Sequence, residues 1–184
     1  MSQIVVARLN DRAQPLDRGD LYEDPLDHVL KQAGLGAVTG GGTLLGANGE
    51  IELCEVEIEL EEVTPKSLEL VTALLERLGA PKGSQLVVDG GAREIPFGAT
   101  EGLGVYLNGT DLPDEVYRTS DVNVVYEEFG RRLQGIGKVH SHWQGPTETA
   151  LYMYGNSYEA MTQALADFLA SYPLCDRARL VRIA

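Results

Sequence analysis

The chain has 184 residues, of which 43% are hydrophobic and 23% are charged, a composition typical of a globular protein and not of a disordered one. Its 28 acidic and 15 basic residues give a formal net charge of −13, which repels the phosphates of nucleic acids and of anionic membranes, so we expect neither as a partner. A basic protein surface or a cationic ligand is favoured instead.

Residues 1–95 form the first half of a predicted repeat. Their alternating or β-rich runs predict strands at residues 3–9, 36–45, 51–60 and 85–88. A first helix is expected between Asp24, which has the residue type of an N-cap, and Gly34. A second helix is expected between the cap Thr64 and Gly79. Residues 10–23 are expected to form a long polar loop, and residues 89–96 the junction with the second half.

Residues 96–184 repeat this order. Strands are predicted at residues 102–107, 138–144, 147–154 and 178–183, with helices at residues 121–133 and 157–172. The halves also coincide locally, because Gly34-Leu35-Gly36 and Gly135-Ile136-Gly137 each follow the first helix. We therefore predict an α+β protein built by tandem duplication of ferredoxin-like βαββαβ units, with antiparallel sheets and helices on one face.

This order of elements resembles that of tandem ferredoxin-like proteins in general, over nearly the whole chain. The resemblance is one of topology and not of catalytic motifs. Such folds include regulatory ligand-binding modules, α/β-barrel oxygenases and isomerases, and partner-binding proteins, so the fold alone does not select a function.

The strand at residues 51–60 alternates strictly between apolar and acidic residues. Glu55, Glu57 and Glu59 should lie on one face, with apolar residues on the other, so one face is predicted to be buried and the other solvated. Burying three like charges between two facing sheets would be costly. We therefore expect the two sheets to join edge to edge, or to face one another with this strand at the rim.

The segment with the most chemistry runs from Val139 to Trp143 and contains His140 and His142. Residues two apart in a strand project from the same face, so the two imidazoles could bind one divalent transition metal, with Glu148 as a third ligand. They could also act as acid–base groups near neutral pH. The competing interpretation is a solvent-facing pair beside Trp143, with no cofactor.

The polar loop before the first helix is a second candidate binding region. Long loops within compact domains are often functional, and Arg18 and Asp20 are its candidate contact residues. Arg18 could equally pair with acids of the same loop, which would make the loop a self-satisfied surface element. Arg18-Gly19-Asp20 matches an integrin-binding tripeptide, and in a cytoplasmic protein we interpret this match as chance.

Two cysteines, Cys54 and Cys175, lie far apart without a C-x-x-C pair, which argues against a disulfide scaffold and a zinc knuckle. Reduced thiols and a cytoplasmic location are the simpler interpretation. Cys54 is expected to be a small buried hydrophobe. No apolar run suggests a signal peptide or a membrane span.

These observations favour a non-catalytic, acidic protein- or ligand-binding module. In character it resembles bacterial inhibitor or immunity proteins, with Glu55, Glu57, Glu59 and Trp143 as candidate contacts for a basic partner. The alternative is an α/β-barrel-type enzyme that uses His140 and His142. A third possibility is a small-molecule sensor that binds its ligand at the loop between the halves.

Overall fold

The computed structural model describes residues 2–184, which divide into two compact units. The first unit contains the chain up to Ala47 and Ile51–Thr100, and the second contains Glu101–Ala184 with the short segment Asn48–Glu50. The division after Thr100 lies slightly beyond the expected boundary, because an additional strand belongs to the first unit.

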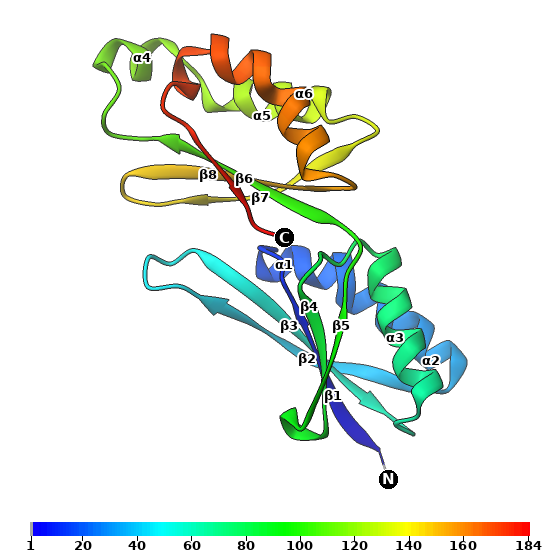
Figure 1. Cartoon of the computed structure of the whole chain (residues 1–184). Coiled ribbons are helices and arrows are strands. Elements are labelled where there is room, and N and C mark those ends of the chain that lie inside the picture. Colours follow the sequence, from blue (N-terminus) through cyan, green and yellow to red (C-terminus); the bar gives the residue numbers. More distant parts are fainter. Residues whose placement is uncertain (1) are drawn as a thin grey trace. The chain divides into compact units, whose positions relative to one another are not determined.

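The first unit is a five-stranded antiparallel sheet with helices on one face (Figure 1). The strands follow the spatial order β2-β3-β1-β4-β5. Their bounds are β1 Gln3–Leu9, β2 Gly36–Leu45, β3 Ile51–Leu60, β4 Ser84–Val88 and β5 Arg93–Phe97. The helical segments are α1 Pro15–Arg18, the π-helical turn η1 Gly19–Glu23, α2 Asp24–Ala33, α3 Pro65–Arg77 and the single turn η2 Asp89–Gly91.

The second unit is a four-stranded antiparallel sheet in the order β7-β8-β6-β9, and α5 and α6 cover one of its faces (Figure 1). The strands are β6 Glu101–Asn108, β7 Gly137–Gln144, β8 Glu148–Gly155 and β9 Arg179–Arg182. The helical segments are α4 Asp114–Thr119, α5 Val122–Arg132, α6 Tyr158–Ser171 and the turn η3 Pro173–Cys175.

Both strand orders are those of the ferredoxin-like βαββαβ arrangement, so the predicted fold class is confirmed. The strands form two separate sheets, so the first of the two expected arrangements, one edge-joined sheet, is not formed. One reason lies in the predicted junction, which folds as β5 and pairs with β4 along its outer edge. That edge is therefore already occupied by the chain itself.

The predicted polar loop at residues 10–23 is largely helical. Helix α1 begins at Pro15 and continues through the π-helical turn into α2, so Asp24 has helical backbone angles and is not an N-cap. The later helix signals behave as expected. Thr64 and Ser67 form a reciprocal capping box, and Gly34 ends α2 in the left-handed conformation with φ of 64°.

Each unit has its own apolar core between its sheet and its helices. In the first unit, strand residues such as Val56 and Ile58 pack with Leu26 and Leu30 of α2. In the second unit, Phe129 of α5 packs with residues of β6, β8 and α6. Among the described residues, no helix is both long enough and apolar enough to cross a membrane.

The two sheets share one strand register. Leu9 pairs with Cys54 in the first sheet, and Leu107 pairs with Thr149 in the second. Each sheet also has a β-bulge at the same place, which leaves Thr39 of β2 and His140 of β7 outside the strand pairing. Residues that this register superposes are called equivalent positions below.

Candidate functional site

The alternation of β3 places its acidic residues on the face of the first sheet that carries no helices. Cys54, Val56 and Ile58 are fully buried in the core, whereas Glu57 is exposed and Glu55 and Glu59 are partly exposed. We call the helix-free surface around Glu55, Glu57 and Glu59 the acidic face. It is solvated as predicted, because burying three like charges side by side would be costly.

The three carboxylates differ in their partners. The guanidinium of Arg8 lies 3.0 Å from Glu55, and the hydroxyl of Ser2 donates a hydrogen bond of 2.7 Å to Glu59. Glu57, between them, has no ion-pair or hydrogen-bond partner for its carboxylate among residues 2–184. Glu57 is therefore the member of the row whose charge is most available to another molecule.

The neighbouring strand leaves the acidic row open on one side. Gly40 pairs with Glu57 and Gly42 with Glu55, so β2 contributes no side chain beside these carboxylates. A Cβ atom at Gly40 would lie 3.3 Å from Glu57 Oε2. Because the glycines leave this space empty, a long cationic side chain could lie across β2 and reach the row.

Exposed apolar groups flank the acidic face. Ile4, which pairs with Glu59, is 56% exposed, and Leu44 at the other end of the row is 50% exposed. Arg8 also approaches Glu94 of β5 at 3.8 Å, so one end of the row is partly neutralised. The surface combines negative charge with apolar contacts, which suits a protein partner better than a simple cation.

Arg18 is held inside the first unit. Its Nε lies 2.5 Å from Glu23 Oε1, and its Nη1 donates to the Gly42 carbonyl and to the Thr43 hydroxyl, at 2.8 and 2.9 Å. The side chain is only 11% exposed. These contacts match the self-satisfied interpretation of this segment, whereas Asp20, two residues later, is exposed on the π-helical turn.

The ion pair of Arg18 and Glu23 occupies the space that a side chain at position 41 would need, and the residue there is glycine. A Cβ atom at Gly41 would lie 2.6 Å from Glu23 Oε1 and 2.9 Å from Arg18 Nε. A side chain at this position would therefore displace the ion pair. β2 is an edge strand, and Arg18 donates a hydrogen bond to its Gly42 carbonyl. This carbonyl is therefore less available for pairing with a strand of another chain.

The β-bulge in β7 separates the two histidines that the sequence had placed on one face. His142 pairs with Leu151, whose side chain belongs to the helix-covered core, whereas the His140 ring lies 5.0 Å from the Tyr154 ring on the helix-free side. The expectation that the two imidazoles share a face is wrong, because it assumed an unbroken period of two.

The proposed third ligand is committed elsewhere. Glu148 accepts two hydrogen bonds of 2.8 Å from Arg179, which lower the pKa of this carboxyl below its usual range. In the part of the chain that the structure describes, no group of three or more His, Cys, Asp and Glu side chains could hold a metal ion. His140, His142 and Glu148 therefore do not form the expected metal centre.

Trp143 belongs to an aromatic cluster on the helix-free face of the second sheet. It packs with Tyr106, Tyr152 and Tyr154, and the rings of Tyr106 and Tyr152 meet edge to face at 6.2 Å. A Cβ atom at Gly145 would lie 2.1 Å from the indole, so the ring rests against the backbone of the hairpin turn. Trp143 thus has a packing role within its own unit.

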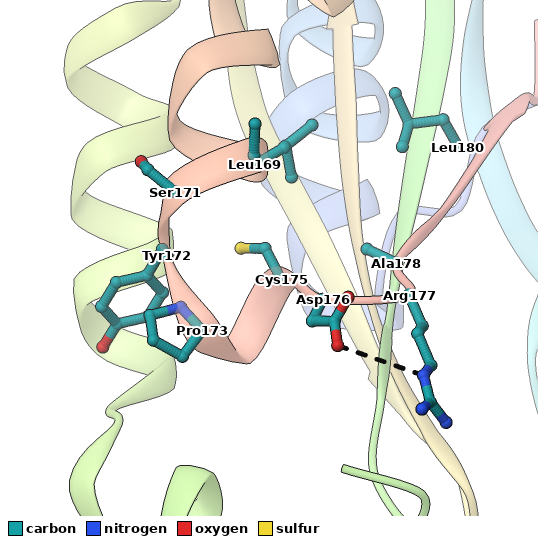
Figure 2. Close-up of a pocket in the computed structure, with 10 residues that line it drawn as sticks. Leu169, Ser171, Tyr172, Pro173, Cys175, Asp176, Arg177, Ala178 and Leu180 are labelled. Atoms are coloured by element: carbon teal, nitrogen blue, oxygen red, sulfur yellow. Dashed lines mark ion pairs between the residues drawn. The ribbon is translucent and has the colours of Figure 1, made fainter.

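A cavity of about 340 Å³ lies where α6 leads into η3 and β9 (Figure 2). Figure 2 shows Cys175 among its lining residues, together with the ion pair of Asp176 and Arg177, which also line it. Burial raises the pKa of the Cys175 thiol to about 11, so at neutral pH it is protonated and a poor nucleophile. Burial also raises the pKa of Cys54.

His142 lines a second cavity, of about 470 Å³, with residues of α5. Val122 and Tyr126 of this helix are 40% and 48% exposed. Sequence reasoning missed this cavity because both residues fit the apolar stripe of the helix. An enzyme that used both histidines would need them at one pocket, but His140 does not line this cavity, and neither does Trp143.

No family model matches the chain, and no curated protein matches it. Solved structures match over nearly its whole length at low similarity. A putative monooxygenase from Lactobacillus acidophilus is 12% identical with a TM-score of 0.31, covering 100% of this chain and 94% of its own. A heme-binding protein from Thermus thermophilus is 16% identical with a TM-score of 0.28, covering 98% and 90%.

The first two RRM domains of the yeast poly(U) binding protein Pub1 are 12% identical with a TM-score of 0.25, and the match covers 99% of each chain. These similarities assign no activity to the chain. Its function has to be inferred from its own side chains.

Proposed function

We propose that the protein is a non-catalytic, cytoplasmic binding module whose acidic face binds a basic surface of another protein, in the manner of an inhibitor or immunity protein. The observation that carries this proposal is Glu57, an exposed carboxylate without a partner among residues 2–184, flanked by two further acids. The net charge of −13 adds long-range attraction for a basic partner.

The surroundings of Glu57 support a protein partner. Gly40 and Gly42 leave room for lysine or arginine side chains above β2, and Ile4 and Leu44 offer apolar contacts at both ends of the row. The protonated, buried thiols and the separated histidines offer no support for a nucleophilic or metal-dependent enzyme. The geometry therefore favours recognition over chemistry.

The test compares charge reversal on the acidic face with the same reversal elsewhere. Glu57→Lys is matched by Glu69→Lys, because Glu69 is an exposed acid on α3, the helix side of the same unit. The probe is a fluorescein-labelled octa-arginine peptide, and its affinity is followed by fluorescence anisotropy at low salt. We expect Glu57→Lys to weaken binding about 5- to 10-fold and Glu69→Lys less than about 2-fold.

The natural partner should follow the same rule. A protein captured from the source cells by the wild type and by Glu69→Lys, but not by Glu57→Lys, would be the expected partner and should be basic. If both variants lost binding equally, the loss would follow from net charge alone. That result would contradict specific binding at the acidic face.

A further inference from the structure

The cavity beside His142 lies between the first turns of α5 and the β7–β8 hairpin, entirely within the second unit. Val122, Asn123 and Tyr126 line it from the helix, and His142, Gln144 and Leu151 from the sheet. We call it the helix–hairpin pocket. Its volume of about 470 Å³ is within the range of small-molecule sites.

The equivalent space in the first unit is filled by the chain itself. His142 is equivalent to Gly41, because His142 pairs with Leu151 as Gly41 pairs with Val56. At Gly41, the position of a side chain is taken by the ion pair of Arg18 and Glu23. The first unit thus closes with its own side chains a space that the second unit leaves open.

The cause of the opening is the path of the segment that follows the first strand of each unit. In the first unit this segment forms α1 and η1, and Arg18 reaches β2. In the second unit the segment forms α4, which contacts η3 near the other edge of the sheet. On this path the carbonyl of Asp111 accepts a hydrogen bond of 3.2 Å from Arg177.

The lining determines which ligands the pocket could accept. It contains no lysine, arginine, aspartate or glutamate, although 23% of the chain is charged. A charged ligand would find no counter-charge there, and burying an unpaired charge is costly. The apolar surface of Val122, Tyr126 and Leu151 faces hydrogen-bonding groups on His142, Gln144, Asn123 and Thr149.

We propose that the helix–hairpin pocket binds a small, uncharged aromatic molecule with one hydrogen-bonding edge. The ring lies against Tyr126, Val122 and Leu151, because these side chains gain most from apolar contact. The polar edge of the ligand bonds with the amide of Gln144 and the imidazole of His142. This site is separate in sequence and in unit from the acidic face, so either proposal can fail without the other.

The experiment uses three probes of the same shape and different charge: benzamide, benzoate and benzamidine. They are titrated into the isotope-labelled full-length chain at about pH 8, where imidazole groups are ordinarily uncharged. The readout is the chemical shift of His142 and Tyr126, so that benzamidine bound at acidic surfaces elsewhere is not counted. We expect benzamide to bind with a dissociation constant on the order of 1 to 10 mM, and the charged probes at least about 5-fold more weakly.

Two matched substitutions locate the site. Val122→Trp should fill the pocket and weaken benzamide binding at least about 10-fold, whereas Val124→Trp, on the same helix but outside the pocket, should change it less than about 2-fold. Val122 and Val124 are 40% and 38% exposed, so neither substitution disturbs the core. Tyr126→Ser provides a second variant, which removes the aromatic wall without filling the space.

Three results would each overturn the proposal. The first is the absence of benzamide-induced shifts at His142 up to about 20 mM. The second is equal binding of all three probes at His142, because the uncharged lining would then exert no selection. The third is unchanged binding of benzamide by both Val122→Trp and Tyr126→Ser.

Discussion

The helix-free faces of the two sheets differ in chemistry although they share one register. β3 carries three carboxylates where β8 carries a small residue and two tyrosines; the equivalent residues are Glu55, Glu57 and Glu59 in β3 and Ala150, Tyr152 and Tyr154 in β8. The same backbone therefore presents an acidic surface in one unit and an aromatic cluster in the other. The difference shows that strand pairing determines where a side chain lies, while the side chain alone determines what it can bind.

The helix-covered sides differ in a second way. In the first unit, the ion pair of Arg18 and Glu23 lies over Gly41, whereas the equivalent His142 borders an open cavity. The segment that follows the first strand therefore fills this space in the first unit, whereas the equivalent segment of the second unit leaves it open.

Separate cores predict separate responses to a core cavity. Phe129→Ala removes a fully buried ring that meets Phe168 edge to face at 6.1 Å, and should destabilise the second unit by about 3 to 5 kcal/mol. Amide hydrogen exchange should accelerate mainly in residues 101–184. Equal acceleration in both units would show a single cooperative core and would break the comparison.

The closed space in the first unit should not tolerate a side chain at Gly41. Gly41→Ala places a methyl group 2.6 Å from Glu23 Oε1 and 2.7 Å from the Glu55 carbonyl, and should cost about 2 to 3 kcal/mol in urea unfolding. Gly42→Ala is the matched control, because the nearest atom to a Cβ at Gly42 is Glu55 Oε2, at an ordinary contact distance of 3.9 Å. Similar costs for the two variants would contradict a specific role for the ion pair.

Equivalent positions on the helix-free faces should also respond differently. Gly102 of β6 is equivalent to Ile4 of β1. A methyl group at Gly102 would lie 2.6 Å from Ile183 Cγ1 and 2.8 Å from Tyr154 Cε1, so Gly102→Ala should cost about 1 to 2 kcal/mol. Ile4→Ala should cost less than about 1 kcal/mol, because Ile4 is 56% exposed. Thermal unfolding of both variants would show which one is destabilised more. A larger cost for Ile4→Ala than for Gly102→Ala would contradict the predicted difference between the two faces.

The smallest expected effect concerns pH. The pKa of Asp27 is lowered, first by its hydrogen bond with Lys31 and also by the amide of Val38, against a partial desolvation. A lowered folded pKa stabilises the protein above the unfolded pKa of about 4, and this contribution is lost as the pH falls through the folded pKa. Asp27→Asn should therefore cost about 0.5 kcal/mol at neutral pH, and the difference from the wild type should vanish in acid.

The measurement is urea unfolding of both proteins at neutral pH and near pH 3, with an NMR titration of Asp27 in the wild type. A carboxyl pKa at or above the ordinary value of about 3.9 would contradict the assignment. In the second unit, the pKa of Glu148 is lowered by its hydrogen bonds with Arg179. Its contribution to stability should therefore also be lost as the pH falls through its folded pKa.

Much of the fold could be predicted from local signals. The alternation in β3, the Thr64 cap and Gly34 after α2 each require only neighbouring residues, and each predicts the observed element. The solvated Glu57 follows from the same alternation. The extent of α1 and η1 was missed, because polar residues and Pro15 favour a loop as readily as a first helical turn.

The candidate sites depended on information that local patterns lack. A single bulge residue, His140, changes which face the following side chains occupy, and its position follows from the pairing of β7 with β8. The role of Arg18 appears only when Gly42, distant in sequence, is brought to it. The helix–hairpin pocket likewise depends on the path of the segment after β6, whose helix α4 contacts η3.

The sequence by itself determined the order of helices and strands, the two similar units and the solvated row of carboxylates, because hydrophobic periodicity and capping act over a few residues. Only the tertiary structure decided which side chains meet across strands, which histidine faces the helices and where a cavity remains. These depend on register, bulges and the path of connecting segments, and long-range packing sets all three.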